Sequence, residues 1–352
     1  KSDNQALSVK FTQQEFNYNS DPTADDLARP TDAPANFNWN SAYGRFIKGT
    51  EAMDMKNYPV AEENLKAALA MDDNFLPALV QLAELYYRNM RYAEALELSR
   101  KAISIDAHHG SGNYVYGLAN EALGHSTDAK DGFSLAPLTT EYRSAAYTRL
   151  SRIAMAEKNY SRALSNAEEA QVYNLYNMDA AQLKVISLRL LNKNREMEAE
   201  LAHIRQLDPL NHFAAIETWL HNPTSENSTA IRKLITNEMP HQSYLEVGIW
   251  YNSIGLTADA LKVFSLSAPC PEIEFWKAYL TDSRLDFSKI DLNLSFPFRS
   301  ETGKVLEALL QKENHWILRY QLALLYKDRN RTIEAKTLLN ACGNEPDFAP
   351  FY

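Results

Sequence analysis

The sequence has only two cysteines, Cys270 and Cys342, in 352 residues. Two cysteines so far apart in the sequence do not form the disulfide framework of a small secreted scaffold, and two are too few for a cysteine-based metal cluster. We expect both to be small apolar side chains in helix packing. No apolar run reaches the ~18 residues that a membrane-spanning helix requires, so membrane insertion is not expected.

Positive charge is also scarce. The chain carries 36 Lys and Arg against 45 Asp and Glu, for a net charge of −9. A protein that binds the phosphate backbone of nucleic acid needs a basic face instead. We therefore expect no nucleic-acid partner.

The sequence contains an internal repeat with a period of 34 residues. Three parallel series share this spacing: Gly49, Ala83, Gly117, Ser151 and Val185; Ala61, Ala95, Ala129, Ala163 and Met197; and Ala68, Ala102, Ala136, Ala170 and Ile204. Self-similarity at a fixed period is the sequence signature of a repeat architecture. The three series together predict an array of equivalent units.

The second copy indicates what each unit contains. Apolar residues recur every three or four positions in 77–89 and again in 93–105, separated by the short break 90–92. This rhythm predicts two amphipathic helices, each of about 13 residues, an ordinary length for a globular helix. Small residues fall where the helices of a pair cross, because only Gly, Ala or Ser lets two backbones approach closely.

These residues resemble the tetratricopeptide repeat family. Pieces of its pattern are Leu79, Leu82, Ala83, Tyr86 and Ala95 in copy two, Tyr116, Gly117, Ala129 and Phe133 in copy three, and the helix stop Asp208 and Pro209 in copy five. The resemblance covers about 42–211 as five copies that start near Ala42, Leu76, Gly110, Ser144 and Met178. It implies an all-α superhelix of antiparallel helix pairs. Copy five departs most, so we expect its packing to be looser or differently angled.

The flanks divide the chain further. We expect an extended N-terminal segment and acidic, proline-rich linker at 1–38, five in-register repeats at 39–211, and a continuation with degenerate repeats at 212–352, with clear copies at about 241–270 and 316–343. Alternating Leu7, Val9 and Phe11 predict a strand. We expect it to have no partner in this chain and interpret it as the last strand of a missing domain. The final apolar residues, 348–352, either fold back onto the last helix pair or interrupt a longer array.

Five phrases suggest a narrower resemblance: FNWNSAYG at 37–44, DAKDGF at 128–133, EYRSAAY at 141–147, SFPFRSET at 295–302 and PDFAPFY at 346–352. They are similar to the C-terminal half of large bacterial proteins whose β-rich N-terminal domain has no known function and has been likened to sugar-binding or carbohydrate-active domains. This resemblance implies an upstream domain in the same polypeptide. It leaves open a second function, that of an accessory module for a carbohydrate-processing enzyme whose catalytic domain lies upstream.

The sequence contains no motif with clear catalytic chemistry. The adjacent His108 and His109 have no carboxylate or cysteine at metal-ligand spacing, which favours a solvated loop. For His203 beside Asp208, capping of a helix end is favoured over metal binding. The glycine-rich stretch 110–117 lacks the GK[ST] ending and the preceding strand of a phosphate loop. We therefore expect no enzyme, no metal and no cofactor.

A helical array instead supplies a concave surface for binding. The family resemblance implies that the first helix of each pair lines this groove, at positions occupied here by Phe46, Thr50, Met53, Gln81, Glu84, Tyr87, Arg88, Tyr114, Leu118, Glu121, Thr148, Arg149, Arg152, Met155, Gln182 and Arg189. Aromatic and arginine side chains are the usual anchors of interfaces. Tyr87, Tyr114, Arg149 and Arg152 are thus the leading candidates for holding an extended peptide or an acidic segment. Alternatively, they cover the inner wall or hold the array's own linker. The expected function is a non-catalytic protein–protein interaction scaffold for a peptide, a partner protein or the upstream domain.

Overall fold

The computed structural model describes residues 6–11, 14–19, 36–293 and 295–352. The predicted linker lies largely outside these residues. Eighteen α-helices run along the described chain: α1 Ala42–Asp54, α2 Tyr58–Met71, α3 Leu76–Arg88, α4 Tyr92–Ile105, α5 Gly110–Leu123, α6 Ser126–Leu135, α7 Arg143–Ala156, α8 Tyr160–Tyr173, α9 Met178–Leu190, α10 Asn194–Leu207, α11 His212–His221, α12 Ser225–Leu234, α13 Pro240–Ser253, α14 Thr257–Leu266, α15 Pro271–Thr281, α16 Ser300–Lys312, α17 Trp316–Asp328 and α18 Thr332–Cys342. Short 3₁₀ turns are η1 Ala136–Leu138, η2 Thr140–Tyr142, η3 Phe287–Lys289 and η4 Ala349–Phe351. Within this part of the chain, no helix is both long and apolar enough to cross a bilayer.

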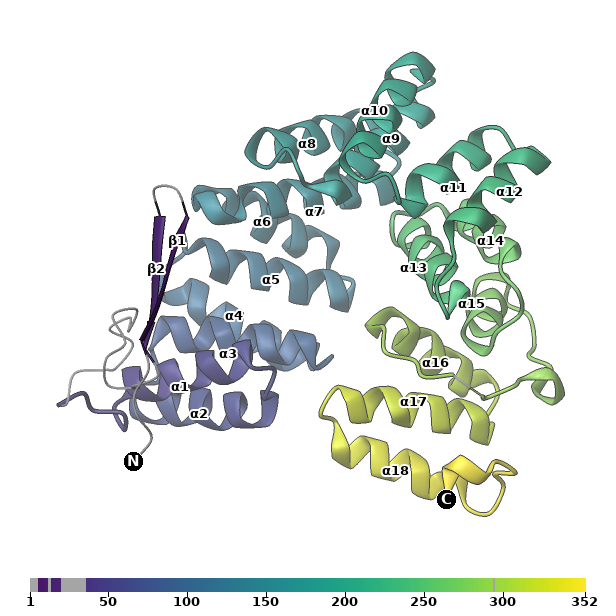
Figure 1. Cartoon of the computed structure of the whole chain (residues 1–352). Coiled ribbons are helices and arrows are strands. Elements are labelled where there is room, and N and C mark those ends of the chain that lie inside the picture. The colour runs from purple at the N-terminus through teal and green to yellow at the C-terminus, as the bar shows by residue number, and fades with distance from the viewer. Residues whose placement is uncertain (1–5, 12–13, 20–35, 294) are drawn as a thin grey trace.

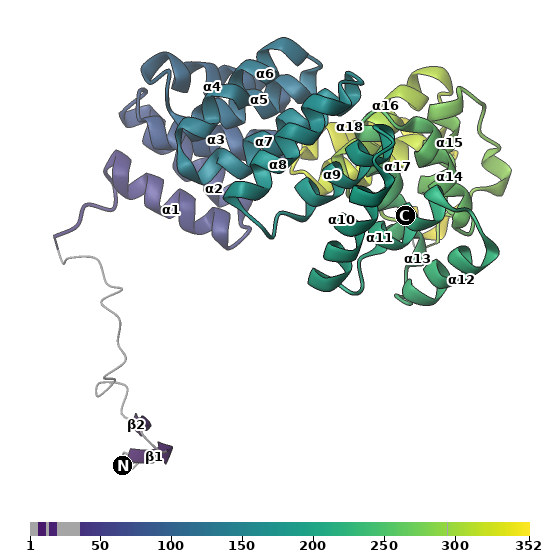
Figure 2. The same cartoon turned by 90° about the horizontal axis from the view of Figure 1, so that it is seen from above.

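Consecutive helices pair and the pairs stack into a curved array (Figures 1 and 2). The first helices of successive pairs, such as α3 and α5 or α7 and α9, pack on one another more closely than the second helices do. The first helices therefore form the inner, concave side. The predicted fold class, an all-α superhelix of antiparallel helix pairs, is confirmed.

The turn within each of the first five pairs repeats one backbone conformation. The residues with positive φ there are Lys56, Met90, Gly124, Lys158 and Asn192, with φ between 59° and 82°. They are spaced by 34 residues, yet only one is glycine. The left-handed conformation costs an L-residue roughly 1–2 kcal/mol, so packing of the two helices must stabilise each turn against this strain.

The turn between pairs repeats as well. Asp72, Asp106, Asn174 and Asp208 each end a second helix, and each side chain accepts a hydrogen bond from the backbone N–H two residues later, at 2.9–3.1 Å. Such Asx turns satisfy backbone groups at a helix end. The third pair departs from this pattern, because α6 ends at Leu135 and the turns η1 and η2 follow.

Small residues allow the two helices of a pair to cross closely. A β-carbon on Gly49 would lie 2.8 Å from the Leu65 side chain, and one on Gly117 would lie 2.7 Å from the Phe133 ring. Ala95 is fully buried at the equivalent crossing of α3 and α4. The small-residue series thus marks places where a larger side chain has no room.

The array curls back on itself, so that α16 and α17 return to the ends of α3 and α5 (Figure 1). Lys304 Nζ donates to the Ala122 carbonyl oxygen at 2.7 Å, and Arg329 Nη1 donates to the Arg88 carbonyl at 3.4 Å. Both carbonyls belong to the last turn of a helix, where the backbone dipole favours a positive charge. Met90 is buried among the apolar side chains of the C-terminal half.

The N-terminal strand has a partner in the chain, so the prediction of an unpaired strand is wrong. β1, Ala6–Phe11, pairs antiparallel with β2, Gln14–Asn19, in a register that places Leu7 opposite Tyr18 and Val9 opposite Phe16. The sequence pattern did not predict the second strand, because Phe16 and Tyr18 are the only apolar residues in an otherwise polar run. Leu7, Val9 and Tyr18 are exposed.

The C-terminal residues fold back onto the last helix pair, the first of the two arrangements predicted for them. The rings of Phe348 and Phe351 lie 5.9 and 5.5 Å from the ring of Tyr320 on α17. Both phenylalanines pack against the apolar core. They cover part of the apolar surface of the final pair.

Candidate binding surface on the concave face

Four of the predicted groove residues lie together on three successive first helices. Tyr87 is on α3, Tyr114 and Glu121 are on α5, and Arg149 is on α7. Arg149 Nη1 lies 3.3 Å from Glu121 Oε2. Both tyrosines interact electrostatically with Arg149, and the Tyr114 ring packs 5.2 Å from the ring of Tyr142. We call Tyr87, Tyr114, Glu121 and Arg149 the tyrosine–arginine cluster.

The charge of this cluster is internally balanced. Burial acts to lower the pKa of Arg149, but Glu121 and the two phenol groups outweigh it, so the net shift is upward and the guanidinium stays cationic. Burial raises the pKa of Tyr87, which keeps that phenol neutral. Because Glu121 already neutralises Arg149, the cluster offers an acidic segment little net attraction.

Glu84 adds a carboxylate to the same face. Burial alone raises its pKa, and it is close enough to Tyr142 to raise the pKa of that phenol as well. Among the described residues Glu84 has no ion-pair partner. This part of the concave face therefore holds a carboxyl group without a cationic partner, and it does not present the free positive charge that the arginines suggest.

Two of the predicted arginines are engaged by the chain itself. Arg152 Nη1 lies 3.3 Å from both carboxylate oxygens of Asp179, and Arg152 Nη2 donates to Ser253 Oγ at 2.6 Å. Arg189 pairs with Glu217 at 2.5 Å and with Asp259 at 2.8 Å. Residues of α9, α11, α13 and α14 thus engage both guanidinium groups within the chain. These contacts favour the alternative prediction that the two arginines belong to the inner wall.

Apolar members of the predicted set are also withdrawn from solvent. Met155 is 1% exposed and accepts a hydrogen bond from Ser187 Oγ at 3.4 Å, while Leu118 is buried beside Phe133. Thr148 is buried and accepts from Asn177 Nδ2 at 2.9 Å. These positions point into the contact between neighbouring first helices, so Met155, Leu118 and Thr148 are corrected to packing residues.

The remaining predicted residues near the N-terminal end are half-buried or exposed. Thr50 Oγ1 donates to Gln81 Oε1 at 2.7 Å across the first two pairs. Phe46 packs edge-on against Phe75 at 5.4 Å. Met53 packs on the apolar core of the first pairs, and the guanidinium of Arg88 lies over the Tyr58 ring at 4.2 Å.

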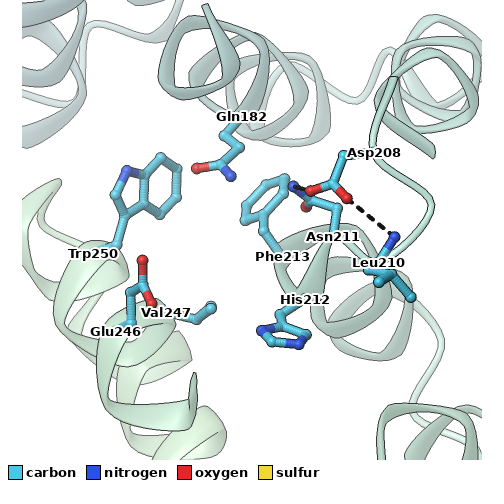
Figure 3. A pocket seen from close by; sticks show the side chains of 9 residues that line it. All are labelled: Gln182, Asp208, Leu210, Asn211, His212, Phe213, Glu246, Val247 and Trp250. Atoms are coloured by element: carbon cyan, nitrogen blue, oxygen red, sulfur yellow. Dashed lines mark hydrogen bonds between the residues drawn. The ribbon is translucent and has the colours of Figure 1, made fainter. Parts of the chain in front are cut away.

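A pocket of about 420 Å³ opens further along the array, between α9, α11 and α13 (Figure 3). Its lining residues are Gln182, Asp208, Leu210, Asn211, His212, Phe213, Glu246, Val247 and Trp250. Only Gln182 was among the predicted groove residues. His212, Phe213 and the three residues on α13 lie beyond residue 211, where the 34-residue register breaks, so repeat positions could not be carried over to them. The aromatic residues within the two helical stretches were a usable signal.

The aromatic wall of this pocket is held in place by hydrogen bonds. Trp250 Nε1 donates to Asp179 Oδ1 at 2.6 Å, and Asp179 is the same carboxylate that binds Arg152. The rings of Phe213 and Trp250 lie 5.3 Å apart at 71°, which forms a corner. Glu246 lies one helical turn before Trp250 on α13, so both side chains face the same way.

The histidines show no arrangement for metal binding. In the described ranges, no three His, Cys, Asp or Glu side chains are grouped as metal ligands. His109 Nδ1 instead accepts from the Gly112 N–H at 3.2 Å and caps the start of α5. The glycine-rich stretch after it is helical rather than a phosphate loop.

Comparison with known proteins gives similarity at the level of solved structures. No family model matches the chain, and no curated protein matches it. A tetratricopeptide repeat protein from Parabacteroides merdae is 15% identical, with 81% of this chain and 98% of that chain covered and a TM-score of 0.44. PilF of Pseudomonas aeruginosa is 16% identical, with 64% and 97% covered and a TM-score of 0.48. YrrB, described as a TPR protein with an unusual peptide-binding site, is 17% identical, with 50% and 91% covered and a TM-score of 0.42.

Proposed function

We propose that the protein is an interaction scaffold that holds an extended segment of a partner along its concave face. The partner is either a separate protein or a domain that precedes this one in the same polypeptide. The observation that carries the proposal is the alignment of two features on first helices: the tyrosine–arginine cluster on α3, α5 and α7, and the pocket on α9, α11 and α13.

The charges on the concave face do not favour an acidic peptide, so we propose that the extended segment is not acidic. Arg149 is paired with Glu121, and Arg152 is paired with Asp179. Glu84 has no such partner. Tyrosine rings supply contact area at a low cost in conformational entropy, so we assign the recognition by the cluster mainly to its aromatic side chains.

Site-specific photo-crosslinking tests this proposal. A benzophenone amino acid is placed at Gln81 or Gln182, both half-buried on first helices, and at Glu97 or Glu168, both exposed on second helices. In cells of the source organism we expect the first two positions to crosslink one and the same partner and the latter two to give none. Crosslinks of equal yield from the second helices, with none from Gln81, would contradict a concave-face role.

A further inference from the structure

We propose that the pocket between α9, α11 and α13 binds one cationic side chain, a lysine or an arginine, of the segment held on the concave face. This inference rests on the proposed scaffold function and specifies the chemistry of its ligand. Three features support it: an aromatic corner, an unpaired carboxylate beside that corner, and a lining without lysine or arginine.

The aromatic corner is preorganised to receive a cation. Trp250 cannot rotate freely, because its indole N–H is bonded to Asp179, which is itself held by two contacts from Arg152. Phe213 stands nearly perpendicular to it. A cation over the face of a tryptophan is attracted by the ring quadrupole, more strongly than over other rings. Figure 3 shows Gln182, Phe213 and Trp250 converging on one space.

The carboxylate beside the aromatic corner is not paired with a lysine or arginine of the pocket lining. Glu246 is exposed and has no ion-pair partner among the described residues. Arg299 lies within electrostatic reach of Glu246, but its guanidinium donates to Gln242 and it does not line the pocket. An incoming ammonium or guanidinium group would therefore pair with Glu246 without displacing an existing cation.

Asp208 adds negative charge at the rim. It accepts hydrogen bonds from the Leu210 N–H and from Asn211 Nδ2, both at 3.1 Å, which fix its position. The pocket volume of about 420 Å³ lies within the ordinary range for a small ligand site. A lysine or arginine would lay its alkyl stem against Phe213 and Val247 and keep its charged end near Glu246.

Titration of three short peptides tests the inference. The probes are acetyl-Ser-Gly-Lys-Gly-Ser-amide and the same peptide with norleucine or glutamate at the centre. Binding is followed on the full chain through the indole N–H signal of Trp250 in protein with ¹⁵N-labelled tryptophan. We expect a saturable shift with the lysine peptide, an affinity about fivefold lower for norleucine, and none for glutamate.

Variants then identify the responsible carboxylate. Glu246→Gln should reduce affinity for the lysine peptide about fivefold and leave norleucine binding unchanged, because it removes the charge and keeps the shape. Glu246→Lys should reverse the preference in favour of the glutamate peptide. Glu97→Gln, an exposed carboxylate on the second helix α4, is the matched control and should change neither. Both positions are exposed, and thermal unfolding verifies that each of the three variants folds.

Equal affinity for the lysine and norleucine peptides would overturn the cationic assignment, as would a preference for glutamate. The lack of a saturable shift with any of the three peptides would overturn the pocket as a binding site. Neither result affects crosslinking from Gln81, which lies on a different pair, so failure of this inference is distinguishable from failure of the scaffold proposal.

Discussion

The terminal methyl group of Met90 lies 2.6 Å from the place that a β-carbon on Gly303 would occupy. Met90 sits in the turn between α3 and α4 with φ of 59°, and Gly303 is in the first turn of α16. The neighbouring Lys304 reaches the Ala122 carbonyl, 182 residues away in the chain. These contacts join the two ends of the curved array.

Replacing Gly303 with leucine should separate the two ends of the curved array. A larger side chain meets both Met90 and Leu325, and overpacking of this kind costs about 1–3 kcal/mol. Small-angle X-ray scattering should show a larger radius of gyration than for the parent chain. Gln311→Leu, at an exposed position on the same helix, should leave it unchanged.

Adding Met90→Ala to Gly303→Leu should partly restore the contact between the two ends of the array, because the alanine removes one of the two side chains that the leucine meets. A double-mutant cycle measures this coupling. Strict additivity of the two unfolding free energies would show that the residues do not meet.

The helical array could be predicted from the sequence, whereas its closure could not. Helices α5 and α9 begin at Gly110 and Met178, where the 34-residue spacing places first helices, because each pair repeats the same local packing. The bond between Arg152 and Ser253 joins residues 101 apart. It depends on the curvature accumulated over several pairs, which no local pattern encodes.

The same reasoning applies to the candidate site. The positions of Tyr87, Tyr114 and Arg149 follow from repeat spacing, since they lie on equivalent faces of first helices. The aromatic wall of the pocket, Phe213 and Trp250, lies beyond the last in-register copy, and Trp250 is held by a hydrogen bond to Asp179 from a different pair. Sequence position alone could not bring these residues together.

Ala95→Leu should destabilise the second helix pair. Ala95 is fully buried where α4 crosses α3, and the added methyl groups have no space to fill. We expect a loss of about 1–3 kcal/mol in the free energy of unfolding, measured by guanidinium titration. Ala93→Leu, exposed on the same helix, is the control; an equal loss there would point to helix propensity rather than overpacking.

Lys158→Gly should stabilise the chain. Lys158 has φ of 60° in the turn between α7 and α8, and the strain relieved there exceeds the entropy that glycine loses, for a net gain of about 0.5–1 kcal/mol. Lys336→Gly, in the interior of α18, should instead cost about 1 kcal/mol. If both variants lose stability in thermal unfolding, the recurring left-handed turn is not strained.

Glu217→Ala should be strongly destabilising. This fully buried carboxylate pairs with Arg189 and accepts a hydrogen bond from the Tyr251 hydroxyl. Removing it leaves Arg189 with Asp259 alone and the Tyr251 hydroxyl without its acceptor, at a cost of about 3–5 kcal/mol. Glu217→Gln keeps an acceptor and should lose less. Equal stability of the two variants in chemical denaturation would contradict a role for the hydrogen bond.

Arg149→Met and Arg152→Met should affect different properties, although both arginines are on α7. The first should weaken partner binding, and the second should lower stability. Arg149 interacts with the Tyr87 and Tyr114 phenols of the tyrosine–arginine cluster, so its loss should displace these aromatic anchors and weaken binding of the crosslinked partner by about tenfold. Arg152 is held by Asp179 and Ser253, so its loss should lower the unfolding temperature and leave affinity nearly unchanged. Titration calorimetry with the partner segment, on variants verified as folded, separates the two effects. Equal weakening by both substitutions would place Arg152 in the binding surface and would contradict its assignment to closure.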